Sequence, residues 1–362
     1  MRYILSILAI AISFYSHAQT DSLKTDSLKQ ALVKHTQAIE ANPKNVSAYI
    51  NRARVKFKLR NYMGSIDDNL KAIELNAQTD TAYTNIGAAN AALKNYTEAI
   101  KNYSKAIQIN PKMYKAFCFR GMAKSSQNNY TAAIADYDSS IALHPTYTDA
   151  YFSRGSANRY LKKYANALHD YSKVIELDTN YTQAYFQRGN CKYDVNAYKD
   201  AWYDYAKTIT RQPNNADAFN ACGNCKFALK DYEGALLDYN TAIELNPRNA
   251  NMRFHRANCR FALDKFTEAT EDLTKTIELN PKYVQAYCAR AHCYIRLKKY
   301  DLAITDCDKA LEINPQCGEA FFRRGNAKHM IGDAVGACTD WAKTVAIGDY
   351  FSAASNIAKY CR

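Results

Sequence analysis

Residues 216–249 read ADAFNACGNCKFALKDYEGALLDYNTAIELNPRN, a unit of 34 residues that recurs along most of the chain. The dipeptide near the end of the unit shows the period, because Asn246-Pro247 returns 34 residues later as Asn280-Pro281 and again as Asn314-Pro315. A fixed period of this length marks a repeat architecture. The repeat therefore decides the fold class before any local propensity is considered.

Two helical patterns fill each unit. We number the unit from 1 to 34, and position 1 falls at Val46, Asp80, Tyr114, Thr148, Thr182, Ala216, Ala250, Val284 and Gly318. Position 8 is always Gly or Ala, and position 20 is always Ser or Ala. Apolar residues at positions 4, 7/8, 10 and 14, and then at 17, 20, 21, 24, 27 and 28, follow helical spacing twice. We expect two short antiparallel helices per unit, the second ended by the proline that is common at position 32.

The pattern resembles the tetratricopeptide repeat (TPR) family. In one unit the residues that carry the resemblance are Phe219, Gly223, Tyr232, Ala235, Tyr239, Ala242 and Pro247. The resemblance implies an all-α superhelix, a right-handed solenoid of helix hairpins, with nine units over residues 46–351. It also implies a non-enzymatic scaffold that binds a protein or peptide segment in a concave groove, because the family serves many partners.

The two ends of the chain differ from the repeats. Residues 1–18 combine a positive start, an apolar run over Ile4–Phe14 and small residues before Gln19, which predicts a signal peptide and an exported protein, periplasmic or secreted. The alternative is an ordinary buried helix. The run is too short to span a bilayer, so we expect no membrane insertion. Residues 19–45 are predicted to form a half repeat that caps the first unit, and residues 352–362 a C-terminal capping helix.

The composition is basic, with a formal net charge of +13. Such a surface favours anionic partners, whereas surface lysine also keeps an elongated protein in solution. The basic residues recur at positions 11, 15 and 16 rather than in one cluster, which favours the second interpretation, and we expect no nucleic acid partner. The alternative function is a cell-envelope protein that binds carbohydrate or an anionic polymer.

Positions 7 and 23 carry opposite charges. Arg occupies position 7 in seven of nine units and Asp occupies position 23 in eight of nine. Pairing within a unit leaves one Asp without an Arg, Asp238 opposite Cys222, whereas pairing with the next unit leaves three mismatches. We therefore predict structural ion pairs within units, represented by Arg120–Asp136, Arg154–Asp170, Arg188–Asp204 and Arg290–Asp306. The alternative is an electropositive stripe for an anionic ligand.

The 11 cysteines have two interpretations. Position 10 is Cys in four units and Ala in four others, which indicates a small buried residue, and Cys222 and Cys225 form a CxxC inside a predicted helix rather than at a helix start. Exported proteins usually pair their cysteines, and the best candidate disulfide joins Cys338 to Cys361 in the predicted cap.

Three histidines form a diagonal across successive units at positions 6, 9 and 12, namely His255, His292 and His329. They are either a zinc site or three unrelated polar residues of the groove. We find no nucleophile–base pair, phosphate loop or paired carboxylates, and so predict no enzyme, no cofactor and no metal.

The resemblance implies that positions 2, 5, 6, 9, 12 and 13 line the concave groove. The partner-binding candidates at these positions are Phe152, Phe186, Asn190, Tyr193, Asn224, Phe254, Asn258, His292, Phe322 and Asn326. Amides can bond an extended peptide and rings can hold its side chains, or Asn at position 9 is simply common in the repeat. Position 5 is never Lys, so the Lys/Asn clamp by which some relatives hold a C-terminal carboxylate is absent.

Overall fold

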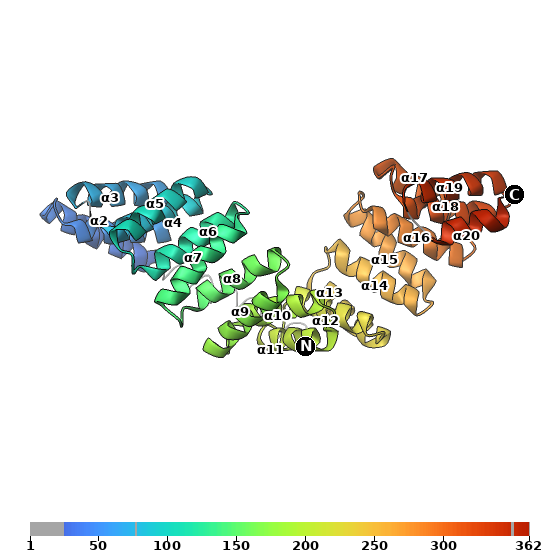
Figure 1. Ribbon diagram of the computed structural model, residues 1–362, viewed down its shortest axis with the longest axis horizontal. Helices are drawn as coiled ribbons and strands as arrows, with labels where there is room; N and C mark the ends of the chain where they lie inside the picture. Colours follow the sequence, from blue (N-terminus) through green and yellow to red (C-terminus); the bar gives the residue numbers. More distant parts are fainter. Residues whose placement is uncertain (1–24, 77, 349–350, 362) are drawn as a thin grey trace, which may run out of the picture. The chain divides into compact units, whose positions relative to one another are not determined.

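The computed structural model describes residues 25–76, 78–348 and 351–361. Within these ranges the chain is all-α and contains no strand (Figure 1). The signal peptide that we predict for residues 1–18 lies outside them. In the described part of the chain, no helix combines the length and the apolar character needed to span a bilayer.

A helix over residues 25–41 comes first, inside the predicted N-terminal half repeat. Paired helices follow, which we number pairs 1 to 9; in every pair the first helix begins at position 1 and the second at position 17. The pairs are α2 (Val46–Lys58) with α3 (Tyr62–Leu75), α4 (Asp80–Ala92) with α5 (Tyr96–Ile109), α6 (Tyr114–Ser126) with α7 (Tyr130–Leu143), α8 (Thr148–Tyr160) with α9 (Tyr164–Leu177), α10 (Thr182–Asp194) with α11 (Tyr198–Arg211), α12 (Ala216–Ala228) with α13 (Tyr232–Leu245), α14 (Ala250–Ala262) with α15 (Phe266–Leu279), α16 (Val284–Arg296) with α17 (Tyr300–Ile313), and α18 (Gly318–Met330) with α19 (Ala334–Ala346). The last helix is α20 (Phe351–Tyr360).

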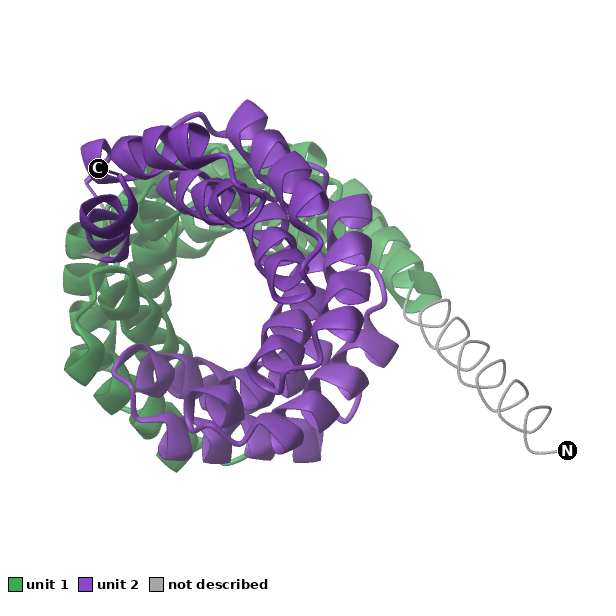
Figure 2. Cartoon of the chain, turned by 90° about the vertical axis from the view of Figure 1, so that its right-hand side faces the viewer, with its two compact units in different colours: residues 1–180 green, residues 181–362 purple. Residues whose placement is uncertain are grey.

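The chain forms two compact units, one up to Asn180 and one from Tyr181 (Figure 2). Pairs 1 to 4 belong to unit 1, and pairs 5 to 9 with α20 belong to unit 2. In both units, first helices of neighbouring pairs contact one another, as α4 contacts α6 in unit 1, and α14 contacts both α12 and α16 in unit 2. The stack therefore curves toward the first helices, which line the inner face of each unit.

The turn inside each pair has one recurring geometry. Position 15 adopts a positive φ in every pair, for example 64° at Lys230 and 89° at Gly332. In pair 6 the Asp231 amide donates to the Lys226 carbonyl, and the Lys230 amide donates to the Phe227 carbonyl. These two backbone hydrogen bonds form a Schellman motif, which ends the first helix and reverses the chain. The side chain of Asp231 then caps α13 by accepting from the Gly234 amide.

The residue at position 8 matches the ring at position 24 of the same pair. Gly occurs wherever position 24 is Tyr or Trp, as in Gly223 with Tyr239 and Gly325 with Trp341. Ala occurs where position 24 is smaller, as in Ala257 with Leu273. A Cβ at Gly223 would lie 2.6 Å from Cε1 of Tyr239, so the missing methyl is what admits the ring. The two helices of a pair are thus held at a spacing that the ring sets.

We expect Gly223→Ala to lower the free energy of unfolding by about 1–3 kcal/mol, because the added methyl displaces the Tyr239 ring. Tyr239→Leu in the same chain should recover part of that loss, since Ala with Leu is the arrangement that pair 7 already uses. Urea unfolding of the wild type, both single variants and the double variant measures the coupling. Additive losses would contradict a direct contact between the two positions.

Candidate functional site

The Arg and Asp residues at positions 7 and 23 meet within each pair. In pair 8, Arg290 Nε lies 2.8 Å and Nη2 lies 2.7 Å from the two carboxylate oxygens of Asp306. The same arrangement joins Arg120 to Asp136, Arg154 to Asp170 and Arg188 to Asp204. Each Asp is buried and each Arg is partly buried between the two helices. We call this series of Arg–Asp bonds the ladder.

The same arginines also reach the preceding pair. Arg120 Nη1 donates to Ser104 Oγ at 3.0 Å, and Arg290 Nη1 donates to Thr274 Oγ1 at 2.9 Å. The guanidinium carbon of Arg290 lies 5.9 Å from the ring centre of Tyr287 at position 4. The arginine charges are thus paired with groups of the repeat itself. The ladder is therefore not the open electropositive stripe that the alternative interpretation requires.

A second cation at position 11 changes the electrostatics of the Asp from pair to pair. Asp340 meets both Arg324 and Lys328; burial opposes ionisation, but the bonds from these two cations hold its pKa below the usual value. In pair 8 position 11 is Tyr294, and burial raises the pKa of Asp306 because Arg290 alone only partly offsets it. Burial also raises the pKa of Asp238, which faces Cys222 and has Lys226 as its cation.

The asparagines at position 9 mostly serve the fold. Asn190 accepts a hydrogen bond from the Tyr205 hydroxyl at 2.8 Å, and Asn224 accepts one from the Tyr239 hydroxyl at 2.9 Å. Asn258 differs, because position 24 of its pair is Leu273 and offers no donor. Of the candidates on the first helices of unit 2, Asn258 is thus the amide that its own pair leaves available for a ligand.

Asn258 lies in a hollow of about 380 Å³ on the inner face of unit 2, which we call the Phe254 pocket. Its lining residues occupy mainly the groove positions that the resemblance implies. Apolar and aromatic side chains supply the larger share: Phe227, Phe254, Ala257, Phe261, Ala262, Leu273, Ala289 and Cys293. Asn258, Gln285, His292, Glu319 and Arg323 add the polar groups. Such a lining, apolar with a few convergent polar groups, is typical of a ligand site.

His292 and Arg323 are the two groups of the Phe254 pocket that are best placed to bind a ligand. Burial, with Arg323 and Arg296 nearby, lowers the pKa of His292 to about 4, so the imidazole is neutral at physiological pH and can accept or donate one bond. Its ring packs against Phe261 in a tilted arrangement, with 4.3 Å between centroids. Arg323 Nη2 bonds Glu319 at 3.3 Å, while its buried Nε has no partner in the described chain. Sequence reasoning missed Gln285, Glu319 and Arg323, although they occupy groove positions 2 and 6.

Unit 1 has a hollow of about 450 Å³ that Phe152 lines together with Tyr130 and Tyr160. Its serines already have partners in the repeat, since Ser125 and Ser156 bond the hydroxyls of Tyr137 and Tyr171. The remaining aromatic candidates of unit 2, Phe186 and Tyr193, pack against the buried cluster around Ala201 and Tyr205. Neither place brings unpaired polar groups and rings together as the Phe254 pocket does.

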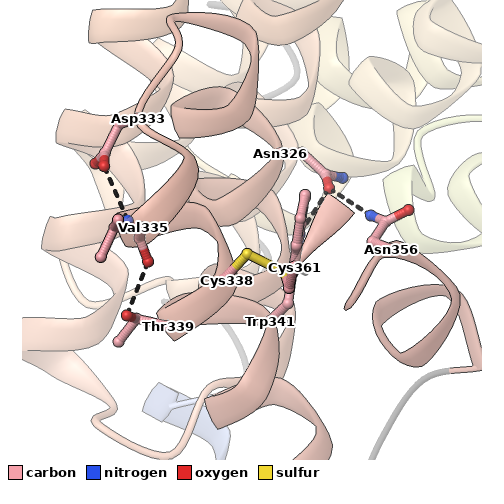
Figure 3. Close-up of a disulfide and its surroundings, with 9 residues drawn as sticks. Asn326, Asp333, Val335, Cys338, Thr339, Trp341, Asn356 and Cys361 are labelled. Atoms are coloured by element: carbon pink, nitrogen blue, oxygen red, sulfur yellow. Dashed lines mark hydrogen bonds between the residues drawn. A yellow bond between two sulfur atoms is a disulfide. The ribbon is translucent and has the colours of Figure 1, made fainter. Parts of the chain in front are cut away.

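The C-terminal helix takes up the candidates of pair 9. Asn326 Oδ1 accepts from Trp341 Nε1 at 3.0 Å and from Asn356 Nδ2 at 3.2 Å, and a disulfide joins Cys338 to Cys361 (Figure 3). Phe322 packs against the cluster around Trp341 and Ala353. Because α20 meets these side chains, we leave Phe322 and Asn326 out of the binding surface.

The three histidines of the diagonal have different neighbours. His255 Nδ1 lies 2.9 Å from Asn220 Oδ1, and the His329 ring packs against Tyr360 in a tilted arrangement with 4.3 Å between centroids. His292 belongs to the Phe254 pocket. Over the described residues, no group of three or more His, Cys, Asp or Glu side chains is arranged to hold a metal ion.

Models of two families, both described as tetratricopeptide repeat, match the chain. One matches residues 81–113, 216–249 and 284–317, and the other matches residues 120–184. These stretches include α12 and α16, which supply Phe227, Gln285, Ala289, His292 and Cys293 to the lining of the Phe254 pocket. Among curated proteins, none matches the chain.

Solved structures resemble the fold. A tetratricopeptide repeat protein from Parabacteroides merdae is 18% identical, with a TM-score of 0.55 over 68% of this chain and 98% of its own. YrrB, described as a TPR protein with an unusual peptide-binding site, is 24% identical with a TM-score of 0.45 over 49% of this chain and 92% of its own. MamA from Desulfovibrio magneticus is 19% identical with a TM-score of 0.45 over 47% and 96%. At 18% identity, the likeness to the Parabacteroides merdae protein shows the fold alone.

The ladder predicts opposite pH dependences for two neighbouring Asp→Asn changes. Asp306 has a raised pKa in the folded state, so its contribution to stability is largest below the unfolded pKa and is lost as pH rises through the folded one. Asp340 has a lowered pKa, so its contribution is present above the unfolded pKa and is lost as pH falls. Urea unfolding of wild type, Asp306→Asn and Asp340→Asn between about pH 3 and 6 measures both differences. With rising pH the wild type should lose stability relative to Asp306→Asn and gain it relative to Asp340→Asn; slopes of one sign would contradict the assignment.

Proposed function

Because the chain is a tetratricopeptide repeat protein, we propose that it is a non-enzymatic scaffold that holds an extended segment of a partner protein on the inner face of unit 2. The observation that carries the proposal is the Phe254 pocket. In it, aromatic side chains lie beside an amide, an imidazole and a guanidinium nitrogen that the repeat does not use in its own hydrogen bonds. In this proposal Asn258 bonds the partner's backbone, and the rings of Phe254 and Phe261 hold one bulky apolar side chain.

The charges around the pocket favour an acidic residue beside that apolar side chain. Burial lowers the pKa of His292 most, and the nearby Arg323 and Arg296 lower it further because they place positive charge beside the pocket. Glu319 bonds only Nη2 of Arg323, so the guanidinium keeps further donors for a carboxylate of the partner. A charge-assisted bond in such a partly dry site fixes the register of the bound segment more than it adds affinity.

The test uses peptides selected by display on the immobilised full-length chain. Asn258→Ala and His292→Ala should each raise the dissociation constant of a selected peptide by about tenfold, because both side chains line the pocket. Asn224→Ala is the matched control, since it removes the same side chain from a pair where the amide already bonds Tyr239. Isothermal titration calorimetry gives the affinities.

Salt separates this proposal from the alternative of an anionic-polymer binder. Binding through the Phe254 pocket should change little between low and physiological salt, whereas binding of a sulfated polymer to a chain of charge +13 should collapse. Peptides that bind Asn258→Ala as tightly as wild type, or that lose affinity as steeply with salt as the polymer does, would overturn the pocket as the binding site.

We also propose that the protein is exported to the periplasm or secreted. The support is the amino-acid pattern of residues 1–18, together with the disulfide between Cys338 and Cys361, a bond that persists in oxidising compartments. Expression of the full chain followed by N-terminal sequencing of the mature protein should find Gln19 as the first residue. A mature protein that still begins at Met1 in the cytosolic fraction would refute export.

A further inference from the structure

A second pair of cysteine thiols lies in contact. Cys288 is in α16 at position 5, and Cys317 is the residue that caps the start of α18 at position 34. Their Sγ atoms are 3.8 Å apart. Cys288 is 1% exposed, whereas Cys317 is only partly buried. The thiol nearest to solvent is therefore in contact with a thiol that solvent does not reach.

The contact follows from the repeat itself and does not depend on one side chain. Positions 5 and 34 of the same pair also meet in pair 7, where the Phe254 and Tyr283 rings are 5.0 Å apart, and in pair 2, where Thr84 Oγ1 lies 3.1 Å from Met113 Sδ. Pair 3 places Cys118 and Tyr147 in one cluster. In pair 8 both positions are cysteine, so the architecture brings two thiols to one point.

We propose that Cys288 and Cys317 are a thiol–disulfide exchange site, which reacts with a disulfide oxidant to bond α16 covalently to the start of α18. These two helices carry Gln285, Ala289 and His292 on one side of the Phe254 pocket and Glu319 and Arg323 on the other. The bond therefore fixes the spacing of two walls of that pocket. The exchange site stands on the contact alone, while its effect on binding rests on the proposed function.

The reaction balances as two successive exchanges. The Cys317 thiolate attacks one sulfur of the oxidant, a mixed disulfide forms, and the other oxidant sulfur leaves as a thiolate. Cys288 gives its proton to that thiolate and attacks the Cys317 sulfur, which expels the second oxidant sulfur as a thiolate that takes up a proton. Two cysteine thiols are oxidised to one disulfide, and one disulfide of the oxidant is reduced to two thiols.

The surroundings set the order of attack. A hydrogen bond from the Cys288 thiol, together with the backbone N–H groups of Ala320 and Glu319 at the start of α18, lowers the pKa of Cys317. The contact with Cys317 and burial raise the pKa of Cys288. Cys317 is thus the attacking thiolate and Cys288 the thiol that resolves the mixed disulfide. The other free thiols are buried, and burial raises the pKa of Cys118 and of Cys225 to about 12.

The experiment incubates the full-length chain with oxidised glutathione, alkylates the remaining thiols after denaturation and maps the peptides by mass spectrometry. The count of alkylated free cysteines should fall from the nine that are outside the Cys338–Cys361 bond to seven, with a Cys288–Cys317 cross-link. Cys288→Ser should instead accumulate glutathione on Cys317, because the mixed disulfide is not resolved. Cys118→Ser, at the same repeat position, should keep the cross-link. Wild type without this cross-link would overturn the exchange site.

Affinity for a selected peptide, measured before and after oxidation, tests the effect on the pocket. Oxidation of wild type should change the dissociation constant by at least about threefold, since it fixes two pocket walls in advance of binding, and should leave Cys317→Ser unchanged. A cross-linked wild type with unchanged affinity would refute the effect on the pocket but not the bond. Failure of the proposed function itself shows separately, as peptide binding that Asn258→Ala does not weaken.

Discussion

The arginine at position 7, which seven of the nine pairs carry, is the side chain that links most pairs to their neighbours. In pair 8, Arg290 forms an ion pair with Asp306 of its own pair, donates a hydrogen bond to Thr274 of the preceding pair and lies over the ring of Tyr287. One guanidinium thus fixes the angle between its own two helices and the placement of the previous second helix. Since desolvation offsets much of the attraction in a buried ion pair, we regard this contact as orienting rather than strongly stabilising.

The sequence predicts the regular part of the molecule well. The period and the small residues at positions 8 and 20 predict the helix pairs, and the mismatch count between positions 7 and 23 predicts that Arg bonds the Asp of its own pair. The match between Gly and an aromatic ring at position 24 is also legible in the sequence. It escapes notice because position 8 appears merely small, until Gly223 and Tyr239 are seen in contact.

Side-chain roles at the candidate site were less predictable. Position 9 gives no sign that Asn190 and Asn224 accept from tyrosine hydroxyls, because that requires knowing which position of the second helix faces them. The axes of packed helices lie about 8–10 Å apart, so helix packing gives no reason to expect the contact between Cys288 and Cys317. The contact forms because Cys317 lies just before α18, where the chain comes closer to α16 than two helix axes do.

Pair 7 shows why a binding site arises where the repeat departs from its own pattern. Pairs 5, 6 and 9 use the Asn at position 9 internally, because it bonds the ring at position 24, and in most pairs an aromatic residue occupies position 4. Pair 7 has Leu273 at position 24, so Asn258 lacks the donor that a ring would supply there. Pair 7 also has Arg253 at position 4, in place of the usual aromatic residue. The substitution that frees the amide also replaces a tyrosine by the smaller leucine that lines the Phe254 pocket. In a chain of near-identical pairs, specificity for a partner therefore has to come from such exceptions, because the shared positions are already committed to holding the pairs together.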